Sequence, residues 1–292
     1  MQNSRTIDSK RIIRAVILGV AASFCYSIMT LLVKLVANDT TENMTGFFRL
    51  AVSLFWIMLV LGYKKLQGKQ FTVKTKHLGI HIIRAVCSFI SILSFYYALR
   101  RVPLVDATSL ALTYALFIPI LSFIFFGTKT STKNWLALIA GFIGIIFILK
   151  PYSNNFNPVA LIALIAGLAT AGSLVGVYEL AKEEKPYTIM LYFFPITFAL
   201  NGILTIFIWK TPSLNTLIVL LMSGVAGTAY QELITRSMSY APPKIVAPLL
   251  YSSIIFSGFF DWIFWHHIPD LYFWIGTFLV ALGCFFSVRY TR

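Results

Sequence analysis

Five ionisable residues stand inside apolar runs that are long enough to cross a lipid bilayer: Arg49, Arg84, Asp106, Glu232 and Asp261. Charges are costly in hydrocarbon, so such residues usually face the interior of a helix bundle and have a partner there. A helix rises about 1.5 Å per residue, which places Arg84 and Glu232 about 9 and 12 Å from the same membrane surface. We therefore expect an Arg84–Glu232 pair, or a polar network with Gln231. Separate extension of each side chain to the surface is the alternative.

The other three charges lie towards the opposite membrane surface. Arg49 comes early in one run, Asp106 early in another and Asp261 late in a third, and Arg100 and Arg101 are near in sequence to Asp106. These residues are expected to form an outer gate of ion pairs that breaks when a cavity opens. Ordinary charges of the membrane interface are the alternative interpretation.

Polar and aromatic side chains near the middle of the runs are the candidates for binding a substrate. A hydroxyl or amide can replace part of a ligand's hydration, and an aromatic face can hold a cation or a ring. Hydrogen bonds between helices are the alternative use of the same groups. The candidate residues are Tyr26, Ser88, Ser91, Thr113, Tyr114, Thr228, Gln231, Tyr251 and Ser252.

Sequence patterns of enzymes are missing. The chain has no HExxH, GxSxG or phosphate-binding loop pattern, and these patterns mark metalloproteases, serine hydrolases and nucleotide-binding proteins. His266, His267 and Asp270 fall in one turn without a fourth ligand. We expect neither an enzyme nor a bound metal or cofactor.

The composition explains where these residues must lie. Of 292 residues, 58% are hydrophobic and 12% are charged, about half the charged fraction of soluble domains. The net charge of +14 would suggest a nucleic-acid partner for a soluble protein. Here it reflects basic residues gathered in loops on one side of a membrane, and no nucleic acid is expected.

The elements that position the candidates are ten apolar runs separated by short polar connections. About 20 apolar residues cross the hydrocarbon core as a helix, in which all backbone groups satisfy one another. The sequence therefore predicts an all-α integral membrane protein. The expected spans are residues 14–36, 45–62, 78–100, 103–126, 133–150, 159–181, 187–209, 213–236, 242–264 and 271–289.

Lysine and arginine alternate between loops in a way that sets the orientation. With a cytoplasmic N-terminus, the inner segments hold 17 basic residues and the outer segments hold 5. Basic residues prefer the cytoplasmic side of short loops. Both termini are therefore predicted to be cytoplasmic, in a multi-pass protein of a bacterial-type inner membrane.

The two halves of the sequence resemble each other at an offset of 139 positions, and a weaker match relates Gly19 to Gly167. We expect two five-span repeats, residues 1–152 and 153–292. Because five is odd, the repeats must insert in opposite orientations, an architecture common in secondary transporters. The matching pairs are Pro103 and Pro242, Leu110 and Leu249, Phe117 and Phe256, Phe125 and Phe264, Trp135 and Trp274, Gly144 and Gly283, and Phe147 and Phe286.

The stretch 97–103 (YALRRVP), followed by Ala107, Leu110, Pro119 and the Phe-Gly pair at 126–127, resembles the EamA-type members of the drug/metabolite transporter superfamily. The resemblance implies a compact bundle with a central cavity between both halves. The sequence departs from the family at one point. A Gly-Glu pair is frequent after the fourth and ninth spans, where this chain has Gly-Thr at 127–128 and His-His at 266–267.

The resemblance implies a secondary transporter for a small polar metabolite, such as an amino acid or an amino-acid derivative. A cationic substrate such as S-adenosylmethionine is a further implication. Without a nucleotide-binding loop, a proton or a counter-substrate would drive transport. A lipid-handling protein and a multipass scaffold are the alternatives. Membrane lipid is the expected surrounding partner, and both monomer and homodimer remain open.

The expected mechanism places the binding site between the halves, near the membrane midplane. Prolines inside the fourth and ninth spans allow kinks there. We expect the site between Thr113 and Tyr114 on one side and Tyr251 and Ser252 on the other, with Gln231 nearby.

The orientation can be tested with reporter fusions. A reporter attached after Arg292 and another inserted in the loop 64–76 should both report the cytoplasm, because the basic residues gather on that side. Activity of either fusion in the periplasm would contradict the topology.

Overall fold

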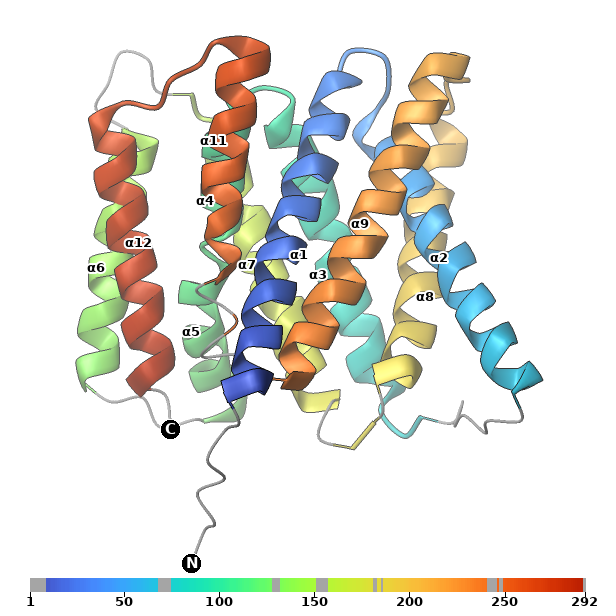
Figure 1. The fold of residues 1–292 in the computed structure, drawn as a ribbon, viewed down its shortest axis with the longest axis horizontal. Coiled ribbons are helices and arrows are strands. Elements are labelled where there is room, and N and C mark those ends of the chain that lie inside the picture. Colours follow the sequence, from blue (N-terminus) through green and yellow to red (C-terminus); the bar gives the residue numbers. More distant parts are fainter. Residues whose placement is uncertain are drawn as a thin grey trace, which may run out of the picture.

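The computed structural model describes residues 9–67, 75–127, 132–150, 157–180, 183–184, 186–240, 246 and 249–290. Within these ranges all regular structure is helical (Figure 1). The helices are α1 Ser9–Leu35, α2 Glu42–Leu66, α3 Leu78–Leu99, α4 Leu104–Ala111, α5 Tyr114–Phe126, α6 Thr132–Leu149, α7 Ala160–Leu180, α8 Pro186–Phe207, α9 Leu214–Tyr240, α11 Ser252–Trp265 and α12 Leu271–Tyr290.

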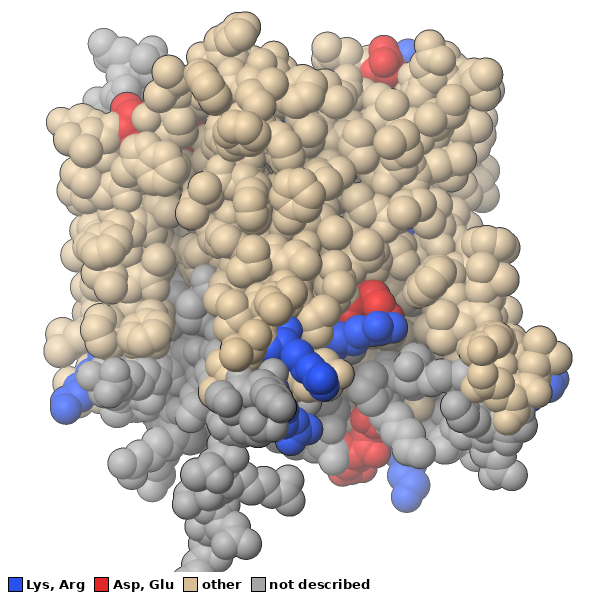
Figure 2. All heavy atoms as spheres, in the orientation of Figure 1, with Lys and Arg blue, Asp and Glu red and all other residues tan. Residues whose placement is uncertain are grey.

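The predicted membrane class is confirmed. Seven helical segments are long and apolar enough to span a membrane, and two shorter apolar helices lie at Trp135–Leu149 and Leu271–Gly283. Together with α11, these helices are consistent with the ten expected spans. Figure 2 shows charged side chains gathered at the two ends of the bundle, with a belt almost free of charge between them. The beginning of α1 and the end of α12 lie at the same end (Figure 1), as an even number of spans requires.

The fourth span is interrupted, and the ninth is interrupted at the equivalent place. Leu112 and Thr113 separate α4 from α5, and Tyr251, 139 positions after Leu112, directly precedes α11. The hydroxyl of Thr113 donates to the carbonyl of Leu110, and that of Ser252 to the carbonyl of Leu249, both at 2.6 Å. Such local bonds compete with regular helical pairing. The connection expected at Pro242 lies outside the described residues.

Most helix packing joins the first half of the chain to the second. Helix α1 packs against α9, α3 against α7, α2 against α8 and α6 against α12. In span numbers, α1–α9 joins spans one and eight, and α3–α7 joins spans three and six. In the repeat, span one is equivalent to span six and span eight to span three, so these two contacts are equivalent. The halves are therefore interleaved rather than set side by side, and their contacts repeat with the sequence.

The contact between α6 and α12 shows the same repetition in its backbone contacts. A Cβ atom added at Gly144 would lie 2.6 Å from the Gly276 carbonyl oxygen, and one at Gly283 would lie 2.6 Å from that of Ala137. Gly144 and Gly283 are 139 positions apart, and so are Ala137 and Gly276. Small residues let membrane helices approach until their backbones touch. Here the same glycine-to-carbonyl contact occurs at two positions that are equivalent in the repeat.

A methyl group at this contact should weaken the fold. Gly283→Ala should lower the free energy of unfolding by about 1–3 kcal/mol, because overpacking a tight interface costs that much. Gly79→Ala is the matched control, since an added Cβ there meets nothing within 4 Å. Thermal unfolding of the purified variants in detergent measures both. A melting temperature for Gly283→Ala at or above that of Gly79→Ala would contradict the close approach.

Candidate functional site

An arginine lies at the centre of the bundle among tyrosines from three other helices. Arg49 of α2 donates a hydrogen bond from Nη1 to the hydroxyl of Tyr96 on α3 at 3.0 Å. Tyr26 on α1 and Tyr230 on α9 lie near the same guanidinium. The rings of Tyr26 and Tyr230 lie 5.2 Å apart, centroid to centroid. We call Arg49, Tyr96, Tyr26 and Tyr230 the central cluster.

Three members of the central cluster keep some accessible surface within the bundle. Tyr96 is fully buried, but Arg49, Tyr26 and Tyr230 are only half-buried. Because α1, α2, α3 and α9 all contribute to the cluster, this exposed surface faces the space between helices rather than the lipid. Arg49 is seven residues from the start of α2, about 10 Å along the helix.

Arg49 Nη1 donates to Tyr96, and the remaining donors of the guanidinium are solvent-accessible. Among the described residues, the buried nitrogens without a hydrogen-bond partner include Nε of Arg84 and of Arg100, but none of Arg49. Gly227 of α9 leaves room for the guanidinium, since a Cβ atom there would lie 2.9 Å from Arg49 Nε. The site therefore presents a cation whose hydrogen-bonding capacity is only partly used.

Aromatic and hydroxyl groups form the walls of the same region. The ring of Phe95 stacks on Tyr26 with centroids 6.1 Å apart. One helical turn beyond Arg49, the hydroxyls of Ser53 and Thr228 are hydrogen-bonded at 2.8 Å. Thr228, a predicted binding residue, is therefore buried and joins α2 to α9.

The sequence placed Arg49 in the outer gate, and the structure corrects this. Arg49 is in contact with Tyr96 deeper in the bundle. Distance along a span does not tell which helices surround a side chain, and that was the missing information. Tyr96 and Tyr230 were not predicted from the sequence. The available sequence signal was their position inside predicted spans that also contain polar residues.

The residues expected to form the site between the two helix breaks are close together, but their hydroxyls are engaged. Thr113 is fully buried, and a Cβ atom at Gly167 would lie 2.8 Å from its Oγ1. The Tyr251 hydroxyl donates to the Leu112 carbonyl at 3.3 Å. Tyr114 and Ser252 are half-buried. The structure thus brings these residues together at the breaks, and their role in binding stays a prediction.

The remaining predicted binding residues lie on α3 and α9. The hydroxyl of Ser91 is 2.6 Å from that of Thr170 on α7, so it serves a contact between helices. Ser88 and Gln231 are half-buried.

The expected Arg84–Glu232 pair is absent, although both residues are in the described part of the chain. Glu232 is paired with Arg236 of its own helix at 2.8 Å. Arg84 donates to the Ile189 carbonyl at 3.3 Å and lies over the Phe193 ring at 4.1 Å. The estimated depths were similar, but α3 packs against α7 and α8 rather than against α9.

Two histidines join the halves at the inner end of the bundle, the end that holds the start of α1. His77 contacts Glu183 at 2.8 Å and His81 contacts Glu184 at 2.9 Å. Neither histidine was predicted from the sequence to have a role. His81 is fully buried and only 8% of the Glu184 side chain is exposed. The hydrogen bond from His77 lowers the pKa of the Glu183 carboxyl.

Asp261 joins the halves at the outer end. Its carboxylate is fully buried, 3.4 Å from Lys34 Nζ, and accepts a hydrogen bond from the Val105 amide at 2.9 Å. Val105 lies in the first turn of α4, where amides have no partner within the helix. Asp106 interacts electrostatically with Lys34 and Asp261. Asp261 therefore binds α1 and the start of α4 at once.

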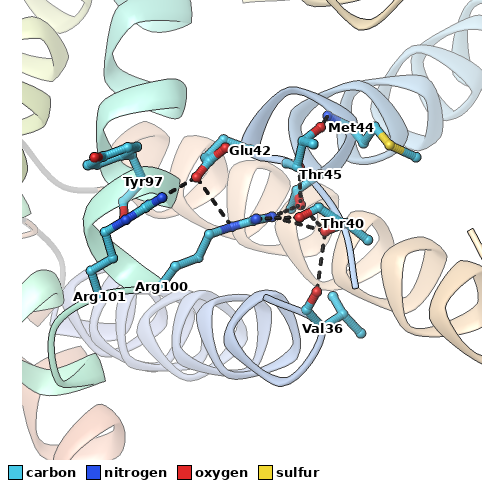
Figure 3. A network of polar contacts seen from close by, with 9 residues as sticks. Val36, Thr40, Glu42, Met44, Thr45, Tyr97, Arg100 and Arg101 are labelled. Atoms are coloured by element: carbon cyan, nitrogen blue, oxygen red, sulfur yellow. Dashed lines mark hydrogen bonds and ion pairs between the residues drawn. The ribbon is translucent and has the colours of Figure 1, made fainter. Parts of the chain in front are cut away.

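Arg100 and Arg101 belong to a separate network within the first half (Figure 3). Arg101 contacts Glu42 at 3.1 Å and Arg100 lies 3.8 Å from the same carboxylate oxygen. Arg100 also donates to the carbonyl and hydroxyl of Thr40. This network fastens the α1–α2 connection to the end of α3. From the second half, Asn157 Nδ2 donates a hydrogen bond to the Arg101 carbonyl at 3.0 Å.

The chain belongs to the EamA-like transporter family. The family's model matches twice, at residues 13–150 and 157–289, so each half of the chain holds one match. The protein is a multi-pass membrane transporter of small metabolites, and it is not an enzyme.

Curated relatives of similar length are transporters. The pseudopaline exporter of Pseudomonas aeruginosa strain UCBPP-PA14 is 28% identical over 92% of this chain and 94% of its own. The riboflavin transporter of Vibrio cholerae is 26% identical, covering 80% and 79%. The S-adenosylmethionine uptake transporter of Rickettsia bellii is 26% identical, covering 82% and 84%.

A solved crystal structure shares the fold. It has a TM-score of 0.63 and 15% identity, over 94% of this chain and 97% of that one.

Loss of the Asp261 carboxylate should destabilise the outer end. Asp261→Ala should cost about 3–5 kcal/mol, because removing one partner leaves a buried charge uncompensated. Asp261→Asn should cost less, since its carbonyl can still accept from the Val105 amide. Thermal unfolding in detergent compares the two. Equal losses for both variants would show that the hydrogen bond to α4 contributes nothing.

Proposed function

We propose that the protein is a secondary active transporter for an amino acid or an amino-acid derivative in a bacterial-type inner membrane. The observation that carries the proposal is the central cluster. It supplies an arginine, tyrosine hydroxyls and aromatic faces in an accessible space between helices of both halves. Amino-acid derivatives combine charged groups with an organic side chain, and such a space can accommodate both.

The ion pairs at the two ends support transport by alternating access. At the outer end Lys34 of the first half meets Asp261 of the second, and at the inner end His81 of the first half meets Glu184 of the second. A central site can open to one side only if the halves separate at that end. Rocking of inverted halves about a central site provides such a motion, with a proton or a counter-substrate as the driving partner.

Two observations support the choice of substrate class. The relatives include transporters named for pseudopaline and S-adenosylmethionine. The faces of Tyr26, Tyr230 and Phe95 suit a ring or a cationic group, which extends the proposal to a cation such as S-adenosylmethionine. The cluster is surrounded by α1, α2, α3 and α9, which favours a metabolite over a lipid entering from the side.

Transport assays in proteoliposomes test the proposal. Under an imposed proton gradient or with unlabelled substrate inside, the protein should take up at least one compound from a panel of labelled amino acids and S-adenosylmethionine. Tyr230→Ala should lower that uptake at least tenfold. The matched control is Tyr63→Ala, because Tyr63 is 63% exposed on the outside of α2.

Two results would contradict the proposal. One is failure to transport any compound of the panel while riboflavin is transported, which would assign another substrate class. The other is equal loss of uptake in Tyr230→Ala and Tyr63→Ala, which would remove the central cluster from the pathway.

A further inference from the structure

We propose that Arg49 binds a carboxylate group of the substrate, so that the central cluster is a site for a singly charged carboxylate. The inference rests on the proposed function and specifies what the site recognises. It is carried by a cation inside the bundle that has accessible, unused donors and, among the described residues, no acidic partner.

The first step is the missing counter-charge. In the described part of the chain, Arg49 interacts with the phenols of Tyr96, Tyr26 and Tyr230 and with no carboxylate. Two other enclosed basic groups are paired with acids, Lys34 with Asp261 and Arg100 with Glu42. A charge held away from water is costly unless it is paired, so Arg49 lacks what the others have.

The second step separates Arg49 from Arg84, which also has no acidic partner. Arg84 is only 4% exposed, its Nη1 is bonded to a backbone carbonyl, and its Nε is buried without a partner. No ligand can reach it without rearrangement. Arg49 is half-buried, and its unused donors are open to the internal space. Of the two, only Arg49 can receive a ligand in this structure.

The third step is the match between the site and a carboxylate. A guanidinium donates two parallel hydrogen bonds to the two oxygens of a carboxylate. A phosphate dianion would call for more positive charge, and no second cation interacts with the Tyr26 or Tyr230 hydroxyls among the residues described. One cation with neutral phenols therefore balances a monoanion.

The fourth step concerns the surroundings of the guanidinium. Gly227 lets α9 pack closely against it, because a Cβ atom there would approach Arg49 Nε and Met29 Sδ to 2.9 Å. The rings of Tyr26, Tyr230 and Phe95 stand beside the same space. A ligand with its carboxylate on Arg49 would place its organic part against these rings.

Benzoate is a suitable probe because it combines a carboxylate with an aromatic ring, and benzamide is its uncharged counterpart. Thermal unfolding of the detergent-solubilised full chain is measured at increasing concentrations of each, since a ligand that binds only the folded state raises stability. Benzoate should raise the melting temperature of the wild type, and benzamide should not. Arg49→Gln should weaken benzoate binding at least tenfold. Arg236→Gln, which removes an arginine that is 63% exposed, should leave it unchanged.

Two further variants keep the test decisive if Arg49→Gln fails to fold. Arg49→Lys retains the charge but loses the paired donors, and should weaken benzoate binding. Gly227→Ala should do the same by crowding Nε. Three results would overturn the inference: equal benzoate binding by wild type and the Arg49 variants, equal effects of benzoate and benzamide, or no effect of benzoate on the wild type. Inorganic phosphate binding through Arg49 more tightly than benzoate would also overturn it.

The binding test and the transport test can fail separately. Benzoate bound through Arg49, together with no transport of any amino-acid compound, would overturn the proposed function and leave the carboxylate site in place. Transport of an amino-acid compound that is unchanged in Arg49→Gln would keep the function and overturn the carboxylate site.

Discussion

A polar group inside a bilayer is costly unless it finds a partner, and this constraint governs the whole chain. Backbone groups find their partners by forming helices, and small residues let these helices pack until their backbones touch. The α6–α12 contact, where Gly144 and Gly283 each face a carbonyl of the opposite helix, has the same geometry twice. Because most helices pack against the other half of the chain, neither half contains a complete core. The contacts that stabilise the fold are thus the same contacts that fix how the two halves are placed relative to each other.

The same constraint separates structural charges from functional ones. At the ends of the bundle, carboxylates hold cations from the other half or from a neighbouring loop, as Asp261 holds Lys34 and Glu42 holds Arg101. At the centre, Arg49 has only phenols. The paired charges hold helices and loops of the bundle together. Arg49, which contacts phenols and no acid among the described residues, is available to bind a ligand. The position of the candidate site follows from this difference more than from the shape of the helices.

Sequence reasoning predicted the fold better than the site, for a physical reason. Apolar runs and the 139-residue offset are properties of the chain itself, so the membrane class and the paired positions of Thr113 and Ser252 were predictable. Which neighbour a side chain faces was not, because that depends on how the helices are arranged. Arg84 therefore received the wrong partner, and the contact between His81 and Glu184 was not predicted.

The matching interruptions of the fourth and ninth spans have a consequence for the balance between conformations. Since Thr113 and Ser252 make the same local hydrogen bond in the two halves, an exchange of shapes between the halves would leave the total cost of bending unchanged. In the proposed alternating-access mechanism, contributions that are equal in both halves would cancel from the free-energy difference between the inward-facing and outward-facing states. That difference would then depend on the unequal parts, chiefly an ammonium–carboxylate pair at one end and imidazole–carboxylate pairs at the other. On this proposal, the repeat would make the two states comparable in energy, and a few side chains at the ends would decide which one predominates.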